Sequence, residues 1–221
     1  MTSVLSEYDA EQDGRESYEL ACREIRQRKI AAGEIKFGAI LVDPPWPNDN
    51  YTDKGVVPSR ADQPYATMTL AEIAGLPLQS LMAKNCAVFL WTMDNLPEAS
   101  AHLAWAWGRP GKPLRLIRSN QFVWVKTCKS DPDKPRNGMG RWTRGSAESV
   151  TVLAQGRPPL GKVPDQTIID ESRREHSRKP DEIYSRIEAL VDGPYLEMFA
   201  RQRWPGWDAW GNEIDKFSEV A

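Results

Sequence analysis

The strongest fold signal in the chain is the sequence Gly38-Ala39-Ile40-Leu41-Val42-Asp43-Pro44-Pro45-Trp46. A short continuous apolar run is typical of a strand that is buried on both faces of a parallel sheet. The strand must end at the prolines, because they remove backbone N–H donors and hold the residues before them extended. Ligands of open α/β sheets bind beyond the carboxyl ends of the strands, so residues 43–46 stand where chemistry is expected.

Strand and helix signals alternate along the rest of the chain. Apolar runs predict further strands at residues 86–92, 120–126, 149–154 and 195–200. Helical spacing or helix-start signals predict helices at residues 17–32, from 69 onward, at 97–107 and at 179–191. This alternation predicts an α/β domain with a mainly parallel sheet. Two turn-rich segments, Pro47–Thr67 and Thr127–Ala147, are predicted as long loops.

Length and composition narrow the class of protein. The 221 residues suit one domain with elaborations, and 40% hydrophobic with 27% charged residues excludes disordered, collagen-like and coiled-coil chains. Residues 1–33 are expected to form an acidic tail followed by a helix, and residues 34–221 the main domain. No apolar run approaches the roughly 18 residues of a membrane span, so no membrane association is expected.

The N-terminus and the cysteines indicate a reduced, cytoplasmic protein. Met1–Glu19 carries six acidic residues and one Arg without an apolar segment, which does not fit a secretory signal. Cys22, Cys86 and Cys128 are odd in number and widely spaced, which argues against a disulfide framework or a zinc site. The chain has only two histidines in addition, so no metal centre is expected.

The net charge of −2 hides a strongly basic segment. Residues 109–144 contain ten basic residues against two acidic ones, and the basic ones are Arg109, Lys112, Arg115, Arg118, Lys126, Lys129, Lys134, Arg136, Arg141 and Arg144. Such a segment can neutralise nucleic-acid phosphates whatever the overall charge, because the interaction is local on the scale of a Debye length of ~8–10 Å. A solvated loop rich in Lys and Arg explains the charge equally well.

The pair Asp43-Pro44 suits the recognition of an amine. A carboxylate and a backbone carbonyl on neighbouring residues can together accept both hydrogens of an exocyclic amine. The amine of adenine is a poor nucleophile because its lone pair is delocalised into the ring, and two acceptors free that lone pair for attack. Trp46 would supply a stacking face and an apolar wall. The alternative is a rigid Pro-Pro turn in which Asp43 and Trp46 are structural.

Several ordered blocks between Lys36 and Asp215 resemble one family, the adenine-N6 methyltransferases related to the catalytic subunit of the messenger-RNA adenosine methyltransferase. The family also includes phage and bacterial DNA adenine methyltransferases. The blocks are Asp43–Trp46, Pro64–Met68, Val88–Trp91, Phe122–Thr127, His176–Tyr184, Leu196–Arg201 and Trp210–Glu213. Seven blocks in the same order are far more specific than the tetrapeptide.

The resemblance implies a Rossmann-like domain that binds S-adenosylmethionine, with a permuted motif order in which the catalytic motif precedes the C-terminal cofactor segment. The catalytic residues it implies are Asp43, Pro44, Pro45 and Trp46. The substrate-binding residues it implies are Tyr65, Trp91, Lys126, Arg141 and Glu148. The cofactor-binding residues it implies are Asp43, Pro45, Lys179, Phe199, Arg201, Arg203, Asn212 and Glu213.

The chain departs from the family pattern at three places. Glu213 stands where the messenger-RNA enzyme has Gln, and Ala200 precedes Arg201 where Gly is more usual. No acidic residue in Glu34–Gly38 clearly matches the one expected to bind the cofactor adenine. Taken alone, Lys179 is an ordinary residue at the start of a helix, and Glu148 either orients the base or simply begins a strand.

The resemblance implies adenine-N6 methylation of DNA by direct in-line methyl transfer, because the chain is most like the phage and bacterial members. An RNA adenosine-N6 methyltransferase, a catalytically silent nucleic-acid-binding scaffold and a protein glutamine methyltransferase are the alternatives. The expected partner is nucleic acid, with a homodimer or a partner subunit as a further expectation. Target sequence and strand preference are left open.

Overall fold

The computed structural model describes residues 23–24, 26–47, 50–52, 55–57, 66–93, 96–128, 130–136, 145–175 and 177–217. The chain divides into two compact units, Met1–Lys36 and Phe37–Ala221. In the first unit, residues 23–24 and 26–31 are helical. This helix ends at Gly33, whose positive φ of 74° is a conformation that glycine adopts without strain.

The second unit is built on one sheet of eight strands in its described part, in the order β10-β9-β1-β4-β7-β5-β6, with β8 also paired to β5. The strands are β1 Phe37–Val42, β4 Met82–Thr92, β5 Arg115–Cys128, β6 Asp131–Pro135, β7 Ala147–Gln155, β8 Ile168–Ser172, β9 Tyr195–Met198 and β10 Trp207–Trp210. A separate antiparallel hairpin joins β2 Asn50–Thr52 to β3 Gly55–Val57.

One side of the sheet is parallel. Strands β10, β9, β1 and β4 all run in one direction, and β8 runs parallel to β5. Strand β7 lies antiparallel between β4 and β5, and β6 is antiparallel to β5. The prediction of an α/β fold with a mainly parallel sheet is therefore confirmed.

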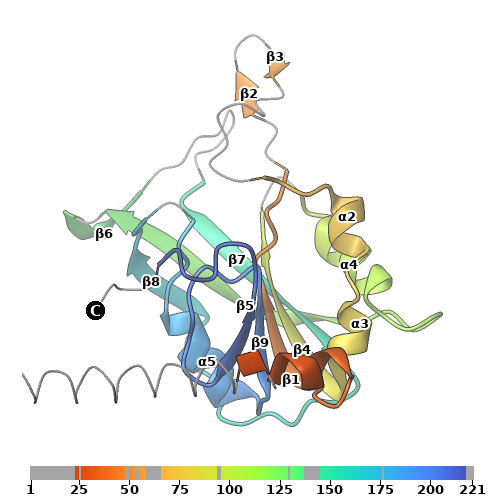
Figure 1. Ribbon diagram of the computed structural model, residues 1–221. Coiled ribbons are helices and arrows are strands. Elements are labelled where there is room, and N and C mark those ends of the chain that lie inside the picture. Colours follow the sequence, from red (N-terminus) through yellow and green to blue (C-terminus); the bar gives the residue numbers. More distant parts are fainter. Residues whose placement is uncertain are drawn as a thin grey trace, which may run out of the picture. The chain divides into compact units, whose positions relative to one another are not determined.

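Helices cover the sheet on its two faces. The helices are α2 Leu70–Ala74, α3 Leu78–Leu81, α4 Ala99–Ala106 and α5 Glu182–Leu190. Figure 1 shows α5 on one face and α2, α3 and α4 on the other. Alternate residues of the strands serve the two faces. Leu41 and Phe89, for example, belong to the same buried cluster as Ile183 and Ile187 of α5.

The strand order reverses at β1. The chain leaves β1 toward β4 on one side, and after α5 it returns to β9 on the other side of β1. In such sheets this reversal opens a crevice at the carboxyl ends of the strands, where ligands bind. Asp43 is the residue that follows β1. Its backbone N–H is held by the carbonyl of Met198 at the end of β9, over 3.4 Å.

The predicted strands at 38–42, 86–92, 120–126, 149–154 and 195–200 are confirmed with shifted ends. The capping box is confirmed as well, because Thr69 and Glu72 bond reciprocally at the start of α2. The two predicted loops are partly wrong, since one contains the β2–β3 hairpin and the other contains β6. Strands β8 and β10 were not predicted, because each pairs on one side only and carries polar residues.

Candidate functional site

A polar cavity of about 220 Å³ opens at the edge of the sheet where β1 ends. Its lining comes from the segment after β1, the carboxyl ends of β4 and β5, the start of the antiparallel β7, and the chain before α5 and after β9. The residues that sequence reasoning singled out and that line it are Asp43, Pro44, Trp46, Trp91, Lys126, Glu148, Lys179 and Arg201. Side chains far apart in the sequence therefore meet where an α/β sheet binds its ligand.

A row of four side chains of alternating charge crosses this cavity, in the order Asp43, Lys179, Glu148 and Lys126. We call this row the charge chain. The Lys179 Nζ lies 3.0 Å from the Asp43 Oδ1 and 3.1 Å from the Glu148 Oε2. The Lys126 Nζ lies 2.5 Å from the Glu148 Oε1. The exposed fractions of these side chains range from 13% to 27%, so solvent screens the pairs only in part.

The pKa values of Glu148 and Lys179 are both shifted toward the charged form of the group. Burial alone would raise the pKa of Glu148, but the ammonium groups of Lys179 and Lys126 outweigh it and lower the pKa to about 2. Burial would lower the pKa of Lys179, but Asp43 and Glu148 outweigh it and raise the pKa above its usual value. Both groups are thus charged at neutral pH.

Aromatic rings form the apolar part of the cavity wall. Trp46 is only 6% exposed, and its Nε1 donates to the Trp91 carbonyl over 3.1 Å. Trp91 and Trp124 meet edge to face with ring centroids 6.4 Å apart. The Lys179 Nζ lies 5.3 Å from the centroid of Trp91, within the range of a cation–π contact. The wall thereby also holds the lysine that pairs with Asp43.

Backbone hydrogen bonds fix the Pro-Pro segment. The Pro44 carbonyl accepts from the Trp46 N–H over 2.8 Å, and the Pro45 carbonyl accepts from the Met68 N–H over 2.9 Å. A carbonyl oxygen has two lone pairs, so Pro44 keeps one for another donor. Pro44 lines the cavity and Pro45 does not.

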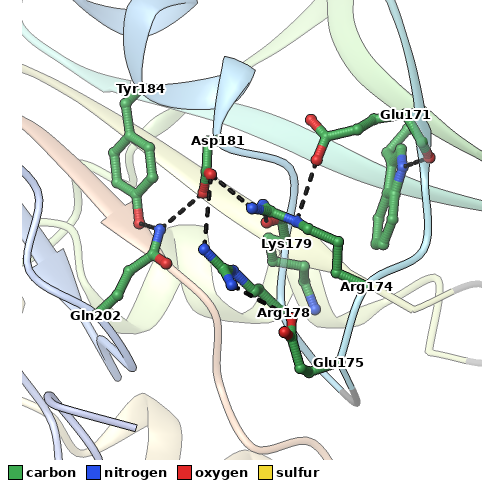
Figure 2. A network of polar contacts seen from close by, with 9 residues as sticks. Glu171, Arg174, Glu175, Arg178, Lys179, Asp181, Tyr184 and Gln202 are labelled. Carbon is green, nitrogen blue, oxygen red and sulfur yellow. Dashed lines mark hydrogen bonds and ion pairs between the residues drawn. The ribbon is translucent and has the colours of Figure 1, made fainter. Parts of the chain in front are cut away.

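A polar network fixes the segment that carries Lys179 (Figure 2). The Arg174 guanidinium bonds the Asp181 carboxylate over 2.6 Å and the Lys179 carbonyl over 2.7 Å. Gln202, from the chain after β9, donates to the other Asp181 oxygen over 2.8 Å. The backbone of Lys179 is therefore held by residues on both sides of it, which limits where its ammonium group can reach.

A buried carboxyl group lies behind Asp43. Glu197 on β9 is paired in register with Leu41 of β1, and 9% of it is exposed. The Tyr184 hydroxyl donates to its Oε2 over 2.8 Å. Burial, together with the negative charge of Asp43, raises the pKa of Glu197 to about 8. Sequence reasoning missed this group, although an acidic residue inside the apolar strand Tyr195–Met198 was a usable signal.

The predicted cofactor residues are brought together only in part. The Arg201 guanidinium lines the cavity, where its Nε lies 3.3 Å from Glu213 and its Nη1 donates to the Ser177 carbonyl over 3.1 Å. Phe199, at a positive φ of 62°, packs edge to face on Trp210. The cavity lining does not include Phe199, Arg203, Asn212 or Glu213. Arg203 instead pairs with Asp215 over 2.9 Å.

Tyr65 and Arg141, which were predicted to bind substrate, lie outside the described residues, as does His176. The cavity also has lining residues that sequence reasoning did not name, and they are Thr92, Met93, Trp124, Arg173, Ser177 and Arg178. Trp124 and Arg178 lie inside two of the blocks that carried the family resemblance. Their place in those blocks was the available signal.

The part of the chain that the structure describes contains neither a candidate membrane span nor a candidate metal site. None of the helices found there is long and apolar enough to cross a membrane. Among those same residues, no group of three or more His, Cys, Asp or Glu side chains could hold a metal ion.

Comparison with known proteins places this site in a family. A Type II methyltransferase, M.MunI of Mycoplasma sp, is 29% identical over 81% of this chain and 78% of its own length. An N(6)-adenosine-methyltransferase MT-A70-like protein of Arabidopsis thaliana is 29% identical over 81% of this chain and 24% of its own length. The N(6)-adenine-specific methyltransferase METTL4 of Homo sapiens is 27% identical over 83% of this chain and 39% of its own length. This chain thus spans only about a quarter of the Arabidopsis protein.

The strands, the cavity and the charge chain all lie within one matched segment. The MT-A70 family model matches residues 37–213, which begin with β1 and end after β10. The chain therefore belongs to the MT-A70 family of S-adenosylmethionine-dependent methyltransferases.

Proposed function

We propose that this protein is an adenine-N6 methyltransferase that acts on nucleic acid. The observation that carries the proposal is the position of Asp43, which follows the central strand and faces a cavity with Lys179 as its partner. The names of the Arabidopsis and human relatives, which refer to N(6)-adenosine and N(6)-adenine, support adenine as the acceptor.

DNA is the proposed substrate. The resemblance to phage and bacterial DNA methyltransferases supports it. So does the match to the bacterial Type II methyltransferase, which extends over 78% of that protein, whereas the match to the Arabidopsis protein covers 24% of its length. RNA is the alternative substrate, and the experiment below distinguishes it from DNA. The homodimer or partner subunit and the cytoplasmic location stay predictions.

S-adenosylmethionine is the methyl donor of MT-A70 methyltransferases, and the cavity offers cations for its carboxylate group. Lys179, Arg178 and Arg201 line the cavity as cations that can bind the carboxylate of the methionine moiety. The buried Arg178 Nε has no hydrogen-bond partner among the described residues, as expected of a donor that awaits a ligand.

The strands after the cavity offer the second part of a cofactor site. Gly211, at the end of β10, lies so close to the chain after β9 that a Cβ there would come within 2.6 Å of the Ala200 carbonyl oxygen. We assign Asn212 and Glu213, which follow it, to ribose hydroxyls. When bound, the cofactor supplies a methyl group on an electrophilic sulfonium centre.

The proposed chemistry uses the two acceptors next to each other in the chain. The Asp43 carboxylate and the free lone pair of the Pro44 carbonyl each accept a hydrogen bond from one of the two N–H groups of the target amine. This draws the nitrogen toward tetrahedral geometry and makes its lone pair available. The rings of Trp46 and Trp91 exclude water from the amine, and the ion pair with Lys179 holds the Asp43 carboxylate in place. Positioning and electrostatics supply the acceleration.

The test is transfer of radiolabelled methyl groups from S-adenosylmethionine to unmethylated duplex DNA, single-stranded DNA, RNA and a protein extract in parallel. Nuclease digestion then identifies the methylated base. N6-methyladenine in a DNA pool is the expected result, and N6-methyladenosine in RNA alone would replace the DNA assignment. Absence of transfer to any pool, with cofactor binding detected by calorimetry, would favour a silent scaffold and contradict the proposal.

A further inference from the structure

A second, larger hollow lies away from the candidate active site. It has a volume of about 510 Å³ and is lined by the start of β4, the chain from residue 109 to the start of β5, and the end of β7. Its basic residues are Lys84, Arg109, Lys112, Arg115 and Arg157, all of them exposed. No acidic residue is among the residues that line it. We call this feature the basic groove.

The basic groove lacks counter-charges in the part of the chain that the structure describes. Within that part, none of the five cationic side chains forms an ion pair with a carboxylate. The candidate active site differs in this respect, because each of Lys126, Lys179 and Arg201 pairs with an acidic residue there. Five like charges around one hollow repel one another, so the groove favours an anionic ligand.

A tight turn fixes the backbone of two of these basic residues. Arg109 and Lys112 exchange backbone hydrogen bonds, over 3.0 Å and 2.8 Å. Pro110 and Gly111 form the turn between them, and Gly111 takes the positive φ of 70° that such a turn requires. The Leu114 N–H then bonds the Ala104 carbonyl of α4 over 2.8 Å. The turn is thus anchored to the fold on its far side.

A second close contact fixes the opposite wall. The Asn85 side chain accepts from the Arg157 N–H over 3.0 Å. Gly156 makes this contact possible, because a Cβ there would lie 2.3 Å from the Asn85 Oδ1. Lys84 and Arg157 are therefore held on neighbouring strand ends without using their charged groups. The backbone on both walls of the groove is therefore fixed.

The basic groove and Asp43 lie at opposite edges of the sheet. β4 and β5 run parallel and begin at the groove, and the antiparallel β7 ends there. From Asn85 to Thr92, β4 covers seven residue steps, which corresponds to about 23 Å at ~3.3 Å per residue. The basic run of residues 109–144 is therefore divided, because β5 carries the chain from the groove to Lys126 in the cavity.

We propose that the basic groove binds the phosphodiester backbone of a nucleic acid at a site separate from the one that receives the adenine. Exposed cations that lie on a fixed backbone and pair with no carboxylate are suited to successive phosphates along a strand. The choice of nucleic acid among polyanions rests on the function proposed above. A strand must extend about seven nucleotides, at 3.4 Å each, to reach from one site to the other.

The test measures binding of the full chain to a fluorescent 30-nucleotide oligothymidylate, which has no adenine to methylate. Two double variants remove groove cations from different segments, R109Q/K112Q from the turn and K84Q/R157Q from the strand ends. The control variant K29Q/K162Q removes the same charge from exposed lysines outside the groove. Thermal unfolding of each variant shows that the fold is retained.

Each groove variant is expected to weaken binding about tenfold or more at 100 mM salt. It should also lower the slope of log affinity against log salt by about 1.4, at ~0.7 for each lost phosphate contact to a single strand. The control should match the wild type. Equal affinities for wild type, control and both groove variants would overturn the proposal.

This experiment is independent of methyl transfer. If the groove variants weaken binding while the wild type methylates no nucleic acid, the groove proposal stands and the proposed function fails. If methylation occurs and the groove variants bind normally, the groove proposal alone fails.

Discussion

The ammonium group of Lys179 lies 3.0 Å from the Asp43 carboxylate and 3.1 Å from the Glu148 carboxylate. One cation therefore pairs with two acidic residues that lie at the ends of two different strands. Asp43 follows β1 and Glu148 lies near the start of β7. Since both acids are partly withdrawn from water, removing the cation leaves two negative charges that repel each other at the centre of the cavity.

The K179M variant is expected to lower the free energy of unfolding at pH 7 by about 2–3 kcal/mol, because it leaves uncompensated charges in a partly buried site. Methyl transfer should be lost at the same time. Urea unfolding at pH 7 and at pH 4 measures the first effect. The loss should be smaller at pH 4, where Glu148, whose pKa Lys179 helps to lower, can take up a proton once that lysine is removed. A K179R variant, which keeps the charge, is the control. An equal loss of stability in both variants would attribute the effect to packing.

Because the pKa of Glu148 is lowered in the folded protein, we expect a loss of stability in acid. Its pKa of about 2 lies below the usual value of 4.5, so its ionised form stabilises the fold fully above pH 4.5. This contribution is lost as the pH falls from about 4.5 toward 2. An E148Q variant should show a weaker dependence of unfolding free energy on pH over this range, measured by denaturant titration. Parallel curves for wild type and variant would contradict the assignment.

For Glu197 we expect the opposite dependence of stability on pH. Its pKa of about 8 lies above the usual 4.5, so the folded state binds a proton that the unfolded state releases. The wild type should therefore lose up to about 1.4 kcal/mol of stability for each pH unit between 4.5 and 8 from this group. An E197Q variant still accepts the Tyr184 O–H and should be relatively more stable at pH 8 than at pH 5. An unchanged pH profile would show that Glu197 is ionised in the fold.

The backbone around Gly211, at the proposed cofactor site, leaves no room for a side chain. A Cβ there would approach the Ala200 nitrogen to 2.8 Å as well as its oxygen, so the backbone of one strand end must move. G211A is expected to cost about 1–3 kcal/mol and to weaken S-adenosylmethionine binding in calorimetry. G145A, whose Cβ would meet nothing within 4 Å, is the matched control. Equal cofactor affinity in G211A and wild type would place the cofactor elsewhere.

The sequence was sufficient for the central strand and for the place of Asp43, because a continuous apolar run that ends in two prolines has few other structural meanings. It was not sufficient for the pairing of Lys126 with Glu148. These residues are far apart in the sequence and meet only because β5 and β7 pair in the register that sets Trp124 opposite Glu148. That register depends on tertiary packing.

The distribution of charge along the sequence was the poorest guide to where the charged residues lie in the structure. Residues 109–144 form one basic segment in the sequence, yet in the structure β5 separates Arg115 from Lys126 along its length. The two ends of that strand serve the basic groove and the candidate active site. Edge strands were missed for a related reason, because β8 and β10 lack the apolar pattern of strands buried on both faces.

The role of Asp43 is tested most directly by comparing the wild type with D43N in one assay of product and one of cofactor binding. Asn keeps the size of the side chain but offers a weaker acceptor and no charge. We expect N6-methyladenine in DNA treated with the wild type and none with D43N, while calorimetry gives S-adenosylmethionine affinities within a few-fold of each other. N6-methyladenine formed by D43N at the wild-type rate would contradict the role of Asp43 as the acceptor of the target amine.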